Sequence, residues 1–84
     1  MNFEYFTNDR FKVLSCMAER QIPVKNKMVI KLSQQEIADI LNMSKVKINS
    51  IIAELKADGY LTQNSPRGKY SLTEQAVNIL SEIK

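Results

Sequence analysis

The sequence predicts one small α+β domain, with its elements in the order helix, strand, helix, helix, strand, strand, helix. Several segments repeat apolar residues at the i, i+3, i+4 spacing of an amphipathic helix. A serine or threonine that can cap a helix precedes most of these segments. Near the end of the chain, two short strand-like pieces flank the stretch NSPRG (64–68), which is rich in turn-forming residues.

Composition limits the function more than the fold. The 84 residues have room for a single domain, 1–84, and the net charge of +3 permits an anionic partner without requiring one. The chain has no histidine and only one cysteine, Cys16, so the commonest general base is missing and neither an internal disulfide nor a zinc cluster can form. We therefore expect no enzyme, no metal and no cofactor, and we expect Cys16 to be a small core residue.

The N-terminal third predicts a helix followed by a strand. Thr7 or Asn8 can cap a helix that runs to about Gln21, where Pro23 follows and ends it. The buried face of this helix is expected to consist of Val13, Leu14, Met17 and Ala18. The alternating stretch KMVIKL (27–32) then predicts a short strand.

Two adjacent helices are predicted in the middle of the chain. Ser33 and Glu36 have the spacing of a capping box at the start of the first, and Ser44 can cap the second, which ends at Gly59. The apolar faces of the two helices are expected to be Ile37, Ile40 and Leu41, and then Ile48, Ile51, Ile52 and Leu55.

The last quarter of the chain predicts a hairpin and a final helix. The strand-like pieces YLTQ (60–63) and KYSL (69–72) pair across the turn. Thr73 can cap a helix over 73–84, and its apolar face is expected to be Ala76, Ile79, Leu80 and Ile83.

The middle pair of helices has the features of a helix-turn-helix over 33–58. Ala38 is small where two helices would cross closely, and Asn42 tolerates the left-handed conformation that the turn needs. An ordinary helical hairpin is the alternative, but it does not require these residues together with the capping box, Met43 and the Ser44 cap.

The stretch LSQQEIADILNMSKVKINSIIAELKADGYL resembles the winged helix-turn-helix domains of bacterial transcription regulators of the catabolite-activator-like and MarR-like types. The tail GYLTQNSPRGKYSLTEQA is similar to their wing, here 60–72, and the final helix after it. The resemblance covers about residues 27 to 80 and implies DNA binding. Many relatives have glycine where this chain has Asn42, and activator-like members often have an acidic residue where it has Val46, so base preference is not transferred.

The expected DNA contacts follow from the surface that the apolar stripes leave free. The N-terminal end of the third helix would enter the major groove, where asparagine suits adenine and lysine suits guanine or phosphate. The wing would contact the backbone or a narrow minor groove. The expected contact residues are Ser33, Gln34, Gln35, Ser44, Lys45, Val46, Lys47, Asn49, Ser50, Ser65, Arg67 and Lys69. Lys25, Lys27 and Lys31 could touch the flanking backbone.

The resulting hypothesis is a cytoplasmic, nucleoid-associated protein that binds double-stranded DNA, first of all as a transcriptional regulator. A homodimer could form through Phe3, Tyr5, Phe6 and the last helix. No apolar run is long enough to cross a membrane, so no membrane partner is expected. Three alternatives stay open: a protein-interaction module on the same fold, the DNA-binding part of a plasmid or phage replication or partition protein, and the DNA-binding piece of a longer regulator.

Overall fold

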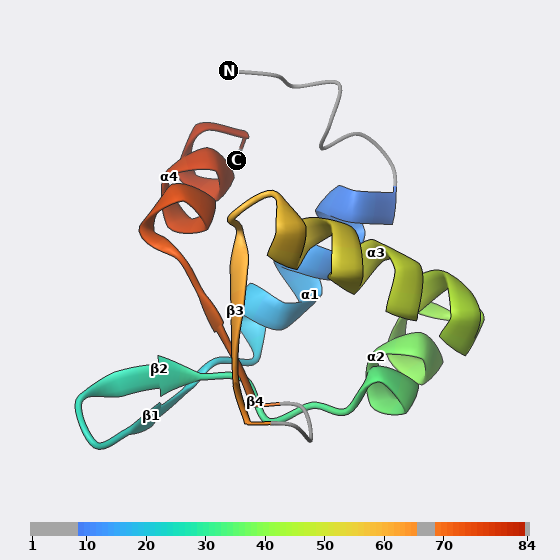
Figure 1. Cartoon of the computed structure of the whole chain (residues 1–84), viewed down its shortest axis with the longest axis horizontal. Coiled ribbons are helices and arrows are strands. Elements are labelled where there is room, and N and C mark those ends of the chain that lie inside the picture. Colours follow the sequence, from blue (N-terminus) through green and yellow to red (C-terminus); the bar gives the residue numbers. More distant parts are fainter. Residues whose placement is uncertain (1–8, 66–68, 84) are drawn as a thin grey trace.

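The computed structural model describes residues 9–65 and 69–83, and the elements follow the order α-β-β-α-α-β-β-α. Figure 1 shows three helices gathered on one side of two small antiparallel hairpins, with the fourth helix at the opposite end. The elements are α1 (Asp9–Glu19), β1 (Ile22–Val24), β2 (Lys27–Val29), α2 (Gln34–Leu41), α3 (Lys45–Ala57), β3 (Leu61–Ser65), β4 (Lys69–Leu72) and α4 (Glu74–Ile83). The predicted α+β class is confirmed, with one strand more than expected.

The additional strand is β1. The sequence pattern predicts only the end of the first helix in this region. Pro23 does not follow a helix that reaches Gln21. It lies in β1 and pairs with Met28 of β2. Lys25 and Asn26 connect the strands with φ angles of 50° and 71°, as a tight hairpin turn requires. Lysine is not a usual residue for such a turn, so the sequence pattern did not predict this hairpin.

The strand expected over 27–32 is shorter than predicted and joins the two hairpins. It ends at Val29, and Ile30 then bridges to Tyr70 with two backbone hydrogen bonds of 2.8 and 3.0 Å. The Ser71 hydroxyl adds a bond of 3.1 Å to the carbonyl of Met28. The wing hairpin is therefore fixed to the first hairpin through β4.

The core lies between α1, α2, α3 and the wing strands. Its buried residues include the whole expected stripe of α3: Ile48, Ile51, Ile52 and Leu55. Val13, Leu14 and Met17 on α1 are fully buried, and so is Ala76 on α4, whereas the side chain of Ile83 lies outside the described part. Cys16 is buried at 5% exposure, and burial raises the pKa of its thiol.

The prediction for Ile40 is wrong, because its side chain is 43% exposed. At about 100° per residue, Ala38 and Leu41 share a helix face with Ile37, while Ile40 points roughly a quarter-turn or more away from the middle of that face. Ala38 is 2% exposed and takes the buried place instead.

The caps and turns of the helix-turn-helix are confirmed. The Ser33 hydroxyl accepts from the amide of Glu36, and the Glu36 carboxylate accepts from the amide of Ser33. Asn42 adopts φ 57° and ψ 46°, and the carbonyl of Ala38 accepts from the amides of both Asn42 and Met43. The Ser44 hydroxyl caps α3 by accepting from the amide of Lys47.

The ends of the last two helices also agree with the prediction. Gly59 follows α3 with a φ of 86°, a conformation that causes little steric strain because glycine has no side chain. The Thr73 hydroxyl accepts from the amide of Ala76 at 3.2 Å. The candidate caps Thr7 and Asn8 lie outside the described residues, as do Phe3, Tyr5 and Phe6.

Candidate nucleic-acid interface

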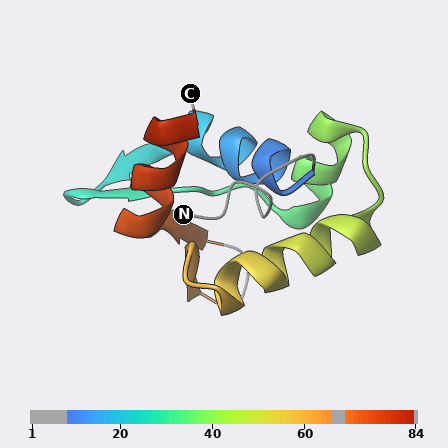
Figure 2. The ribbon, with the colours of Figure 1, turned by 90° about the horizontal axis from the view of Figure 1, so that it is seen from above.

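The third helix, α3, presents one long side to solvent. Figure 2 shows it along one edge of the molecule, with α1 and α2 on its inner side. The buried stripe fixes its rotation, so the residues on the other side of the first two turns are exposed, and Val46 is 81% exposed. The exposed set contains the predicted residues Ser44, Lys45, Val46, Lys47, Asn49 and Ser50.

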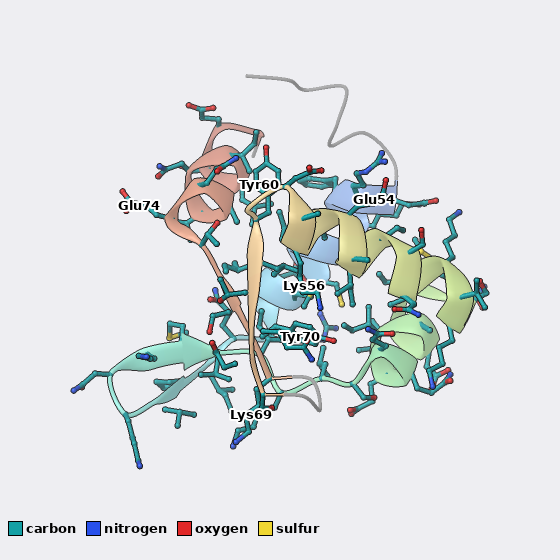
Figure 3. All side chains as sticks on the ribbon, in the orientation of Figure 1. Glu54, Lys56, Tyr60, Lys69, Tyr70 and Glu74 are labelled. Atoms are coloured by element: carbon teal, nitrogen blue, oxygen red, sulfur yellow. The ribbon has the colours of Figure 1, made fainter. Side chains whose placement is uncertain are left out.

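One flank of α3 faces the wing. Lys56 marks this flank, because its ammonium group donates to the Gln63 amide oxygen of β3 at 2.8 Å (Figure 3). Lys45 and Asn49 follow the same helical row toward the N-terminal end. The Lys45 ammonium group and the Asn49 amide therefore lie on the flank of α3 that faces the wing.

The other flank faces the first turn of α1. Lys47 forms an ion pair with Asp9, and Arg10 forms one with Glu54 at 2.7 Å. A solvent-open groove of about 490 Å³ lies between the two helices and is lined also by Ser44, Val46 and Ser50. The hydrogen bond from Lys47 lowers the pKa of the Asp9 carboxyl, so it is charged at neutral pH.

The start of α2 holds three predicted residues in three different ways. The Ser33 hydroxyl is engaged in the cap. The Gln34 amide donates to the Tyr70 hydroxyl at 3.3 Å, which connects α2 to the wing strand β4 (Figure 3). Gln35 is exposed and donates to Asp39 within its own helix at 2.9 Å. Of the three, Ser33 and Gln35 are exposed, and Gln34 is partly buried.

The wing carries the remaining predicted residues. Ser65 ends β3 and is partly buried, while Lys69 begins β4, is exposed and points away from the core (Figure 3). Arg67 lies outside the described residues. Asn64 donates to the Ser71 hydroxyl at 2.7 Å, which stiffens the hairpin between them.

The cations of this surface are not equivalent. Within residues 9–65 and 69–83, neither Lys45 nor Lys69 takes part in an ion pair. Lys47 has its charge balanced by Asp9. The surplus positive charge thus lies on the wing side of α3, and the α1 side is closer to neutral.

Four residues of the interface escaped the sequence prediction: Asp9, Arg10, Gln63 and Tyr70. Asp9, Arg10 and Tyr70 act through partners distant in the sequence, which are Lys47, Glu54 and Gln34, whereas Gln63 bonds Lys56 across the α3–β3 junction. Neither local spacing nor periodicity signals such contacts. Over the described residues there is no cluster of side chains that could hold a metal ion, and no helix long and apolar enough to cross a membrane.

Comparison with known proteins agrees with this geometry. Residues 12–76 match the Crp-like helix-turn-helix domain. The comparison with curated proteins gives no match. The described elements are those of a winged helix-turn-helix DNA-binding domain, with the β3–β4 hairpin as the wing.

Three solved structures share the fold. A transcriptional regulator of the CRP/FNR family from Thermus thermophilus has a TM-score of 0.71 at 19% identity, over 95% of this chain and 44% of its own. The CO-dependent transcription factor CooA from Carboxydothermus hydrogenoformans has a TM-score of 0.68 at 18% identity, over 92% of this chain and 37% of its own. TubR from Bacillus thuringiensis serovar israelensis pBtoxis, bound to 24 bp of tubC, has a TM-score of 0.68 at 21% identity, over 95% of this chain and 85% of its own.

Proposed function

The chain belongs to the Crp-like helix-turn-helix domain family, and from this premise we propose that it is a transcriptional regulator that binds double-stranded DNA sequence-specifically. In this proposal the N-terminal half of α3 enters the major groove and the wing lies on the backbone or in the minor groove. The chain is then no enzyme, and it works in the cytoplasm on the nucleoid.

The observation that carries the proposal is the exposed N-terminal half of α3. The buried stripe of α3 is complete without its exposed residues. Folding therefore does not require the side chains of Lys45, Val46, Asn49 and Ser50. Asn49 can bond adenine N6 and N7, Lys45 can bond guanine O6/N7 or a phosphate, and Val46 can contact a thymine methyl. One helix face therefore offers chemistry for several base edges.

Two further elements would fix the register on the duplex. The N-terminus of α2 has the positive end of a helix dipole, beside which Gln35 could bond a phosphate. Lys69 extends from the wing, and Arg67 belongs to the same hairpin sequence. Contacts of this kind position a protein without reading sequence.

A binding titration over a series of salt concentrations tests the proposal. Random-sequence duplex should bind weakly, with an affinity that falls steeply as salt rises, because lysines and arginines release counterions from phosphates. Selection from a random duplex library should then enrich one sequence. A folded protein with no duplex affinity at any salt would contradict the proposal and favour the protein-interaction module on this fold.

A second DNA-binding role is supported by one of the structural neighbours. The chain spans 85% of TubR, which is bound to 24 bp of tubC, but only 44% and 37% of the two transcription factors. The likeness to TubR supports, as the alternative, the DNA-binding part of a plasmid or phage replication or partition protein. Footprinting on the selected sequence separates the two roles: a regulator should protect a short isolated site, whereas arrays of adjacent sites would favour the alternative.

A further inference from the structure

The contact between α1 and α3 contains a reciprocal pair of charges. Asp9 and Arg10 are neighbours on α1, and each meets the opposite charge on α3: Lys47 for Asp9 and Glu54 for Arg10. Both ion pairs border the same groove of about 490 Å³. The Asp9 carboxylate thus neutralises the charge of Lys47, which belongs to the surface proposed to bind DNA.

The Asp9–Lys47 pair can open without disturbing the fold. The Lys47 side chain is 52% exposed and that of Asp9 29%, so neither charge is enclosed by the core. The Lys47 amide is held separately, by the Ser44 cap of α3. The flexible lysine stem can therefore move its ammonium group while its backbone stays in the helix.

A DNA phosphate would compete for the same ammonium group. Lys47 is in the first turn of α3, between the exposed residues Val46 and Ser50, and this is the end that would enter the major groove. A phosphate oxygen and a carboxylate oxygen are both anionic acceptors that suit a lysine. Lys47 thus has one acceptor in the free protein and a second one in a complex.

We propose that Asp9 limits the affinity of this protein for DNA: it holds Lys47 in the free state, and Lys47 exchanges the carboxylate for a phosphate when the complex forms. This inference rests on the proposed function. Breaking the Asp9–Lys47 ion pair opposes binding. This effect does not depend on base sequence, so Asp9 should weaken binding to every duplex.

The test combines Asp9→Asn, Lys47→Gln and the double variant in binding titrations on one random duplex over several salt concentrations. Asp9→Asn should bind about two- to fivefold tighter, the range expected from one partly exposed ion pair. Its slope of log affinity against log salt should equal that of the wild type, because Lys47 reaches a phosphate in both. Lys47→Gln should lower that slope by about 0.9 and abolish the gain from Asp9→Asn.

The matched control is Glu74→Gln, which removes the same charge from the exposed first turn of α4, at the end of the molecule away from α2 (Figures 1 and 3). It should bind as the wild type does, because distant exposed charges are screened. Circular dichroism and melting temperature should show that every variant is folded. Asparagine keeps the shape of the aspartate side chain.

Several outcomes would overturn the inference. Equal or weaker binding by Asp9→Asn means that the pair only orients α3. A gain that persists without Lys47 means that Asp9 repels DNA directly. A slope steeper by about 0.9 in Asp9→Asn means that Lys47 stays with Asp9 in the wild-type complex. In these three cases wild-type binding still supports the proposed function, whereas a folded wild type that binds no duplex overturns both.

Discussion

At the scale of single residues, the two flanks of α3 differ in their contacts with the rest of the protein. Lys45 and Asn49 lie on the flank marked by the Lys56–Gln63 bond, while Lys47 is fixed to α1 by Asp9. An exposed amide, which takes no part in an ion pair, is better suited to reading a base edge than a lysine that already has an acceptor. The residue most worth testing for sequence readout is therefore Asn49.

Asn49→Ala should weaken binding to the selected site by about 1–3 kcal/mol, the value of one good base contact, and should weaken random duplex much less. The measurement is a titration of both duplexes with wild type and variant. Asn78→Ala on the exposed side of α4 is the matched control. Equal losses on the two duplexes would make Asn49 a backbone contact.

The ionisation of Asp9 should make the stability of the protein depend on pH. The hydrogen bond from Lys47 lowers the pKa of this carboxyl in the folded state, with Lys12 adding a smaller effect of the same sign. A lowered folded pKa gives stability that is complete above the unfolded value of about 3.9 and is lost as pH falls through the folded pKa. Urea midpoints of wild type and Asp9→Asn should therefore differ near neutral pH and converge in acid. A constant difference would show that the pair contributes nothing through ionisation.

At the scale of elements, the turn between α2 and α3 depends on one small residue. Ala38 is 2% exposed, and its carbonyl accepts the amides of Asn42 and Met43 that close the turn. A larger side chain would separate α2 from the core and pull on both hydrogen bonds. Stability and DNA affinity should therefore respond together at this position.

Ala38→Leu should lower the free energy of unfolding by about 1–3 kcal/mol, because the core must shift to admit the added atoms. Thermal or urea denaturation measures the loss. The same substitution at the exposed Ala57 of α3 is the control and should change stability little. An unchanged melting temperature in Ala38→Leu would mean that the two helices do not approach each other closely there.

The wing is the element whose mode of contact the sequence leaves open. If Arg67 and Lys69 bind phosphates, their double alanine variant should weaken all duplexes alike and lower the salt slope by about 0.9 for each lost contact. If they enter the minor groove, the loss should be greatest on A·T-rich flanks, where the groove is narrow and its potential most negative.

Titrating sites with A·T-rich and with G·C-rich flanks distinguishes these two modes. Lys25→Ala with Lys27→Ala removes the same charge from the β1–β2 hairpin, which projects away from α3 (Figures 1 and 2), and tests separately whether these exposed lysines touch the flanking backbone. If the wing variant binds every site as the wild type does, the hairpin contributes no contact and α3 carries the binding.

At the scale of the whole molecule, α4 packs three residues into the core and leaves another side exposed. It lies at the far end from α2 (Figures 1 and 2), and its Val77 is 51% exposed. Two-fold pairing is common among proteins of this architecture, so a homodimer through α4 and the aromatic residues Phe3, Tyr5 and Phe6 remains a prediction. Sedimentation equilibrium should then give twice the chain mass, and Val77→Lys should shift it toward the monomer. A wild-type monomer at every concentration would contradict the dimer.

Much of the fold followed from local rules, and the rest depended on contacts between distant segments. The stripe on α3, the capping box and the left-handed Asn42 were predictable because each is set by residues within a few positions. β1 was missed because its turn uses Lys25, and Ile40 was misplaced because spacing alone does not show on which side the core lies. The Asp9–Lys47 pair needed the tertiary structure, since no sequence pattern joins those two positions.

Tyr70 connects the elements that would meet DNA. Its backbone bridges to Ile30, its hydroxyl accepts from Gln34 at the start of α2, and its ring is 2% exposed (Figure 3). The separation between the helix-turn-helix and the wing is therefore set by the protein and not adjusted to the ligand. A base pair inserted between the two contacted segments would rotate one of them by about a tenth of a helical turn. The duplex would have to absorb that rotation by untwisting, so the spacing within the site should be read as strictly as its bases.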